Sequence, residues 1–203
     1  MENRSDPYEK ARAIFRKHGG ALRTSEAIRA GVHPRTLYAM RDAGELFRLS
    51  RGFYRLADLP PLGNPDLVSV SRRAPDGVIC LISALAFHKI TTQVPHVVYL
   101  AVARASYPPK INRPPVRVFR FSHQAFDAGV ETRTADGAQL RIYSPEKTLA
   151  DCFKYRNKIG LDVAIEALRL YRERKQIKAD AIIRFANICR VYRVMRPYLE
   201  AIL

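Results

Sequence analysis

Apolar residues in the first part of the chain recur at helical spacing, in short blocks that end in glycine. The first block is predicted as a helix that opens at Asp6 and carries Ala11, Ile14 and Phe15 on one face. The helix ends before the glycines at 19–20, because glycine commonly terminates a helix. We expect this helix to support the two helices that follow it.

Two further short helices are predicted on either side of a tight turn, over residues 26–30 and 35–43. Their boundaries rest on residues that favour the start or the end of a helix. These residues are an N-cap at Thr24 or Ser25, terminating glycines at Gly31 and Gly44, and Pro34 in the first turn of the second helix. The block is therefore predicted to be a helix-turn-helix.

The spacing of apolar residues changes from helical to alternating after residue 45. Residues 46–50 and 53–56 are predicted as two strands, and Arg51 with Gly52 as the two-residue turn between them. Helix, turn, helix and hairpin is the order of a winged helix-turn-helix domain, which we assign to residues 1–58. The first function that this order indicates is DNA binding.

The proline-rich segment 59–65 is predicted as a linker. Residues 66–203 are predicted as a mixed α/β domain with a helical C-terminus, so that the fold class is α+β. The apolar run 78–90 is expected to be a buried helix after a turn, with a strand starting at Val78 as the alternative. The other strands are predicted at 97–102, 116–121, 130–133 and 140–143, and the other helices at 66–73, 147–155, 162–174, 180–190 and 192–203.

The chain is strongly basic. Its 203 residues include 35 Lys and Arg against 19 Asp and Glu, which gives a formal net charge of +16. The excess is spread over both predicted domains, so a basic tail is not its source. Such a balance favours polyanionic partners through the long-range field and the release of counterions. Double-stranded DNA is the expected partner, and the alternative is a basic protein with no nucleic-acid partner.

The second helix of a helix-turn-helix lies in the major groove, and its N-terminal residues meet base edges. We therefore predict base and backbone contacts from one face of this helix, opposite the core-facing Leu37 and Met40, and phosphate or minor-groove contacts from the hairpin. The predicted DNA-binding residues are Arg35, Thr36, Tyr38 and Arg41 on the helix, and Arg48, Arg51 and Arg55 on the hairpin. The alternative is a solvated basic face on a winged helix that binds other proteins.

The histidines and cysteines predict neither a metal site nor a disulfide framework. The five histidines are not paired with one another at helical spacing. Cys80, Cys152 and Cys189 lie far apart in apolar stretches, as expected for buried, reduced cysteines of a cytoplasmic protein. The polar N-terminus is unlike a signal peptide, and no apolar run has membrane-spanning length. We expect no membrane segment and no cofactor.

The best enzyme-like cluster accompanies the helix predicted at 147–155, for which Ser144 is the expected cap. Glu146, Lys147 and Asp151 near a strand end could indicate a metal-dependent nuclease that is directed to DNA. The two acidic residues are equally explained by attraction to the positive end of the helix dipole. We favour this structural role and predict no catalytic residue.

Two sets of motifs together resemble one known family. In the N-terminal block they are Leu22-x-Thr24, Ala27-x-x-Ala30-Gly31-Val32, Leu37-Tyr38 and Leu46-x-x-Leu49-x-Arg51-Gly52-x-Tyr54. In the second block they are CLISAL at 80–85, His88-x-x-Thr91 and YSPEKTLAD at 143–151. Through these motifs nearly the whole chain resembles the AbiEi-type antitoxins of type IV toxin–antitoxin systems, which act in abortive infection and phage defence.

The resemblance implies a bacterial protein that is encoded beside a nucleotidyltransferase toxin. Such antitoxins repress their own operon by binding repeats in its promoter, and they counter the toxin without necessarily forming a stable complex with it. The winged helix would carry the DNA contacts, and the C-terminal domain would carry antitoxicity and support cooperative promoter binding. The alternatives are a stand-alone DNA-binding transcriptional regulator and an RNA-binding or protein-interaction module.

Overall fold

The computed structural model describes residues 6–59, 63–136, 138–174 and 176–202. Its contacts divide the chain into two compact units. The N-terminal unit contains residues up to 69 together with 134–139, and the second unit contains 70–133 and 140–203. Residues 60–62 of the predicted linker lie outside the described residues.

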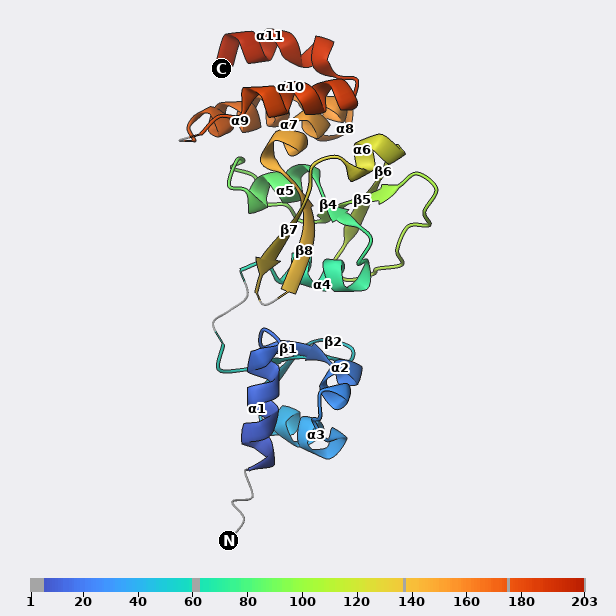
Figure 1. Ribbon diagram of the computed structural model, residues 1–203, viewed down its shortest axis with the longest axis vertical. Coiled ribbons are helices and arrows are strands. Elements are labelled where there is room, and N and C mark those ends of the chain that lie inside the picture. Colours follow the sequence, from blue (N-terminus) through green and yellow to red (C-terminus); the bar gives the residue numbers. More distant parts are fainter. Residues whose placement is uncertain (1–5, 60–62, 137, 175, 203) are drawn as a thin grey trace. The chain divides into compact units, whose positions relative to one another are not determined.

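The N-terminal unit is a small α/β domain whose helices pack on an antiparallel sheet (Figure 1). The sheet order is β1-β3-β2. Its elements are α1 Pro7–Lys17, β1 Ala21–Arg23, α2 Thr24–Arg29, α3 Pro34–Asp42, β2 Leu46–Ser50 and β3 Phe53–Leu56. The core contains Phe15 from α1 together with Leu37 and Met40 from α3, all fully buried. This arrangement confirms the predicted winged helix-turn-helix class, and β1 is an addition that the apolar pattern did not predict.

The start of α2 differs from the prediction, because neither Thr24 nor Ser25 is the N-cap. Helix α2 begins at Thr24, after Arg23, whose backbone N–H donates to the Glu26 carboxylate at 2.7 Å. The Thr24 backbone N–H donates instead to the carbonyl of Gly52 at 2.9 Å. The reason lies in the sheet: β1 pairs with β3 up to Arg23, so Thr24 faces the turn of the hairpin and ties α2 to it.

The rest of the chain folds around a mixed five-stranded sheet of order β6-β5-β4-β8-β7. Strands β5 and β6 are parallel, as are β4 and β8, whereas β4 and β5 are antiparallel. The strands are β4 Val78–Ile79, β5 Val98–Ala103, β6 Val116–Phe121, β7 Val130–Ala135 and β8 Ala138–Tyr143. The helices are α4 Pro65–Arg73, α5 Leu81–Phe87, α6 His123–Asp127, α7 Pro145–Lys154, α8 Arg156–Ile159, α9 Leu161–Arg172, α10 Ala179–Ile188 and α11 Tyr192–Ile202.

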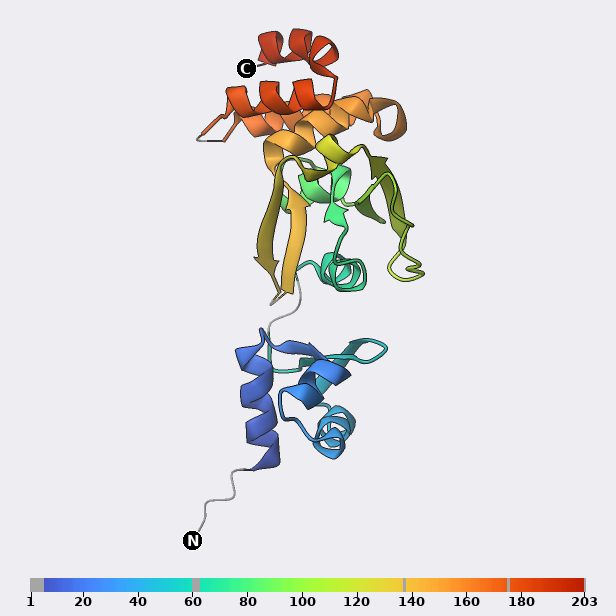
Figure 2. The same cartoon turned by 45° about the vertical axis from the view of Figure 1, so that its right-hand side comes forward.

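Helix α7 is the central helix of the second unit. It packs against α5, α9, α10 and α11. Figure 2 shows the C-terminal helices, in orange and red, stacked in layers at one end of the sheet. The Ser144 hydroxyl accepts a hydrogen bond from the Lys147 backbone N–H, which confirms the predicted cap. The apolar run 78–90 contains both predicted alternatives, because β4 precedes α5. The structure therefore confirms the α+β class with a helical C-terminus.

In the described part of the chain, no helix is both long and apolar enough to cross a membrane.

Candidate nucleic-acid interface

Helix α3 is held by its apolar face and by its cap. Leu37 and Met40, three positions apart, are fully buried in the core of the N-terminal unit. The His33 ring nitrogen Nδ1 accepts a hydrogen bond from the Arg35 backbone N–H at 3.2 Å, and Pro34 occupies the first turn. With these residues fixed, the opposite face of α3 is directed outward.

The outward face of α3 carries the predicted contact residues. Arg35 is exposed, Thr36 is half-buried and the Tyr38 side chain is 41% exposed. The Arg41 guanidinium lies 5.1 Å from the Tyr38 ring centroid and donates to the Asp42 carboxylate at 2.8 Å. That hydrogen bond with Asp42 is the main cause that raises the pKa of Arg41. Arg41 is therefore partly neutralised, whereas Arg35 has no side-chain partner among the residues that the structure describes.

The β2–β3 hairpin forms the wing. Its turn places Arg51 and Gly52 at the tip, where Gly52 has a φ of +70° that an L side chain rarely adopts. Arg48 and Arg51 are exposed, so two of the three predicted wing residues are on the surface. Phe47, which was not predicted as a contact residue, is 58% exposed beside them. Its alternation with buried Leu46 was the pattern that could have identified it.

Arg55 is the one predicted contact residue that is not on the surface. Its exposed fraction is 8%, and its Nη1 donates to the carbonyl of Leu59 at 3.3 Å. Arg55 lies on β3, the central strand, which pairs with β1 on one side and β2 on the other. All four residues of β3 are buried, so we leave Arg55 out of the proposed contact set.

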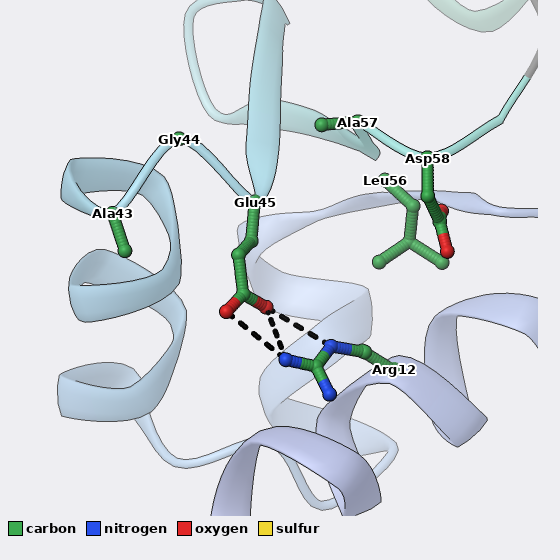
Figure 3. A pocket seen from close by; sticks show the side chains of 7 residues that line it. All are labelled: Arg12, Ala43, Gly44, Glu45, Leu56, Ala57 and Asp58. Atoms are coloured by element: carbon green, nitrogen blue, oxygen red, sulfur yellow. Dashed lines mark hydrogen bonds and ion pairs between the residues drawn. The ribbon is translucent and has the colours of Figure 1, made fainter.

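Apart from Asp42, which pairs with Arg41 on α3, the acidic residues Glu45, Asp58 and Asp6 contact α1. Figure 3 shows the Glu45 carboxylate and the Arg12 guanidinium, which are joined by hydrogen bonds of 3.0 Å, in a pocket of about 370 Å³. Asp58 pairs with Arg16 at 2.6 Å. Asp6 caps α1 through the Tyr8 backbone N–H. These contacts fasten α1 to the sheet and leave the positive potential of the unit on the N-terminal part of α3 and on the wing.

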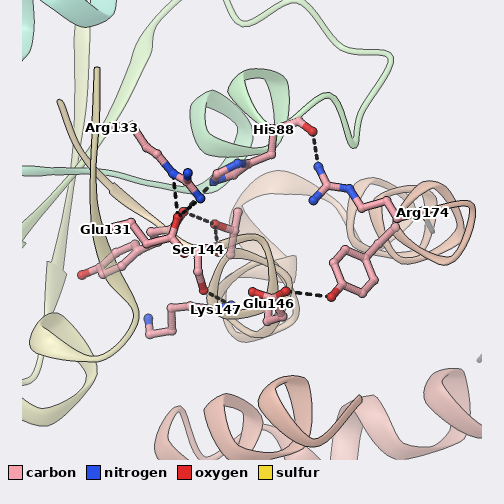
Figure 4. Close-up of polar contacts among 10 residues, drawn as sticks. His88, Glu131, Arg133, Ser144, Glu146, Lys147 and Arg174 are labelled. Atoms are coloured by element: carbon pink, nitrogen blue, oxygen red, sulfur yellow. Dashed lines mark hydrogen bonds and ion pairs between the residues drawn. The ribbon is translucent and has the colours of Figure 1, made fainter. Parts of the chain in front are cut away.

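The enzyme-like cluster of the second unit is buried and fully engaged. The Lys147 Nζ lies 2.6 Å from both carboxylate oxygens of Asp151, and both side chains are completely buried. The Glu146 carboxylate accepts from the Tyr171 hydroxyl at 2.8 Å, as Figure 4 shows. Burial raises the pKa of Asp151. Each predicted member of the cluster thus has a packing or hydrogen-bonding role inside the helical layer.

Histidine and cysteine side chains of the second unit also have structural environments. The His88 Nε2 lies 2.7 Å from the carbonyl of Tyr143, and Arg174 donates to the His88 carbonyl (Figure 4). Burial lowers the pKa of His88 and raises the pKa of the Cys80 and Cys152 thiols. Among the described residues, no group of three or more His, Cys, Asp or Glu side chains could hold a metal ion.

The comparisons with known proteins agree with this fold. Residues 9–57 match the family model described as "Transcriptional regulator, AbiEi antitoxin". No curated protein matches the chain. The crystal structure of the RV2827C protein from Mycobacterium tuberculosis is similar over 97% of this chain and 82% of that chain, with a TM-score of 0.57 and 15% identity. That similarity concerns the fold alone. The family match covers α1 from residue 9 through β3, so the N-terminal domain is similar in sequence to the AbiEi antitoxin family of transcriptional regulators.

Proposed function

We propose that this protein binds promoter DNA through α3 and the β2–β3 wing and represses its own operon, as the antitoxin of a type IV toxin–antitoxin system. In this role it counters a nucleotidyltransferase toxin, works in the cytoplasm and has no catalytic activity of its own. The contact set consists of Arg35, Thr36, Tyr38 and Arg41 on α3 and Arg48 and Arg51 on the wing.

The observation that carries the proposal is the distribution of charge on the N-terminal unit. The carboxylates Glu45 and Asp58 pair with the arginines of α1. The exposed guanidinium groups of Arg35 and Arg51 lie on the two elements with which a winged helix approaches a duplex. Arginine can bind guanine through two hydrogen bonds in the major groove and can bind phosphate from the wing.

Fluorescence anisotropy with the DNA upstream of the protein's own gene tests promoter binding. A scrambled duplex of equal length and composition is the control. We expect the upstream DNA to bind at least about 10³-fold more tightly than the scrambled duplex at physiological salt, as sequence-specific binders do. Equal affinity for both duplexes would remove the repressor function and leave non-specific electrostatic binding.

The antitoxin part of the proposal has a separate test in cells. The gene that neighbours this one is expressed from an inducible promoter, alone and together with the present chain. A nucleotidyltransferase gene whose toxicity is relieved by the chain would support the antitoxin function. A neighbouring gene that is not toxic, combined with normal promoter binding, would favour the stand-alone regulator.

The nuclease alternative is less well supported, because Lys147 and Asp151 neutralise each other in the interior. Purified protein incubated with plasmid DNA and Mg²⁺ or Mn²⁺ should leave the plasmid intact. Cleavage that the Asp151→Asn variant loses, while the variant stays folded, would establish the nuclease instead.

A further inference from the structure

The second unit contains a cavity that promoter binding by the winged helix does not use. It has a volume of about 770 Å³ and opens at the carboxyl ends of the parallel strands β5 and β6. Helix α6 follows β6 at its edge, and the C-terminal ends of α7 and α10 complete its lining. In sheets that contain parallel strands, ligands commonly bind at the carboxyl ends of those strands.

Four cationic side chains from separate elements line this cavity: Arg104 after β5, Arg120 on β6, Lys154 at the end of α7 and Arg190 after α10. All four residues are exposed. In the part of the chain that the structure describes, none of their side chains makes an ion pair or a hydrogen bond. Other arginines of the same unit are anchored, since Arg141 donates to the Asp76 carbonyl and Arg156 to the Phe153 carbonyl.

The single acidic residue of the lining cannot neutralise these cations. Both oxygens of Asp151 accept from the Lys147 Nζ at 2.6 Å, and one of them also accepts from the Cys189 Sγ at 3.3 Å. Lys147 and Asp151 together contribute no net charge to the floor of the cavity. The four cations therefore define its potential, and like charges that converge around a concave surface attract an anion.

Arg190 has a left-handed backbone conformation, which decides how its side chain can be tested. Its φ is +55°, the left-handed conformation that follows helix α10. Glycine, and less often asparagine, usually occupies such a position, because most residues that have a Cβ are strained in this conformation. At this position the chain places a guanidinium on the cavity.

The shape and the chemistry of the cavity indicate the class of its ligand. Its volume is that of a small-molecule site, and Phe121, Ala125 and Ile188 supply an apolar wall beside the cations. Guanidinium groups bind phosphate oxygens through paired hydrogen bonds. We propose that this cavity binds a small anion that carries at least two phosphate groups. The phosphates of a nucleic-acid backbone have the same chemistry, but a concave cavity with an apolar wall fits a compact ligand better than a duplex.

Isothermal titration of the full chain with inorganic tripolyphosphate at constant ionic strength tests the proposal. We expect saturable binding to one site, and about tenfold weaker binding in the Arg190→Gly variant, because one charge-assisted contact is lost. Glycine relieves the left-handed backbone, so this variant should keep or raise the melting temperature. A loss of affinity then cannot be ascribed to unfolding.

Lys89→Gly is the matched control. Lys89 is an exposed cation with a φ of +57° after α5, outside the cavity lining. This substitution removes the same charge and relieves the same kind of backbone conformation, and it should change tripolyphosphate affinity by less than about twofold. Arg120→Gln provides a second cavity variant, for which we expect a loss similar to that of Arg190→Gly.

Four results would overturn the proposal. The first is the absence of saturable tripolyphosphate binding to the wild-type chain. The second is an equal loss in Arg190→Gly and Lys89→Gly, which would indicate a diffuse field. The third is a loss in Arg35→Ala but not in the cavity variants, which would put the anion on the winged helix. The fourth is an equal loss of random duplex and tripolyphosphate affinity in the cavity variants, which would assign the cations to a nucleic-acid backbone.

Discussion

Two arginines of the wing show which features of a residue can be predicted from the sequence and which depend on the sheet. Arg51 and Arg55 both follow the alternating pattern of a basic hairpin, and both were predicted to contact DNA. Only Arg51, in the turn, is exposed, whereas Arg55 lies on β3, whose four residues are all buried. The order of strands in the sheet is set by the pairing of β1 with β3, which residue spacing within the hairpin does not reveal.

This difference predicts separate effects for two substitutions of the same kind. Arg51→Gln should weaken DNA binding on all sequences and lower the salt slope of binding by about one unit, as the loss of a phosphate contact does. Arg55→Gln should lower the melting temperature, because it removes a partly buried hydrogen bond to the Leu59 carbonyl. Fluorescence anisotropy at several salt concentrations measures the first effect, and thermal denaturation measures the second. A salt slope for Arg51→Gln equal to that of the wild-type protein would contradict the wing assignment.

His88 predicts a pH dependence of folding. Burial lowers its pKa in the folded state below the ordinary value of 6.5. Its contribution to stability is therefore present above the pKa of the unfolded chain and is lost as the pH falls through the lower folded pKa. The free energy of unfolding should decrease from pH 7 toward pH 5. In His88→Gln, whose amide can still donate to the Tyr143 carbonyl, the decrease measured by urea titration should be smaller. An unchanged pH profile would show that His88 is not responsible.

At the scale of elements, the helices with strong local signals were predicted well. Pro34 and Ser144 mark the starts of α3 and α7, where the structure has them. The short strands β1 and β4 were harder to predict. Their partners are remote in sequence, and two or three residues carry too little pattern to identify a strand. The prediction of the α2 N-cap was wrong for the same reason, since the pairing of β1 decides where that helix begins.

Helix α7 contains the buried ion pair of Lys147 and Asp151. We expect the effects of substituting these two residues on the unfolding free energy to be coupled. Removing only one partner leaves an uncompensated charge in the interior, so Asp151→Asn should cost about 3–5 kcal/mol of unfolding free energy. The Lys147 ammonium also lies 4.2 Å from the Tyr143 ring centroid, which partly replaces its lost solvation. The double variant Lys147→Met with Asp151→Leu should recover most of the loss, because an apolar pair of similar volume avoids burying charge. Additive losses in urea denaturation would contradict this coupling.

At the scale of the whole molecule, we propose that the two units use their positive charge for different ligands. In the N-terminal unit, the carboxylates Glu45 and Asp58 neutralise α1 and leave α3 and the wing positive. In the second unit, four exposed cations line a cavity. The net charge of +16 predicted a polyanionic partner but not this division. Where the cations converge depends on tertiary contacts between segments that are far apart in sequence, such as β5 and α10.

The affinity of the Arg35→Ala variant for DNA tests the central claim most directly. Fluorescence anisotropy would compare the upstream DNA with a scrambled duplex, and Arg169→Ala, an exposed arginine on α9, is the matched charge control. We predict that Arg35→Ala loses about 1–3 kcal/mol on the upstream DNA, the value of a base contact, and much less on the scrambled duplex. Arg169→Ala should lose little on either duplex. Equal losses for Arg35→Ala on both duplexes, or no loss on either, would contradict the assignment of α3 as the helix that recognises the promoter.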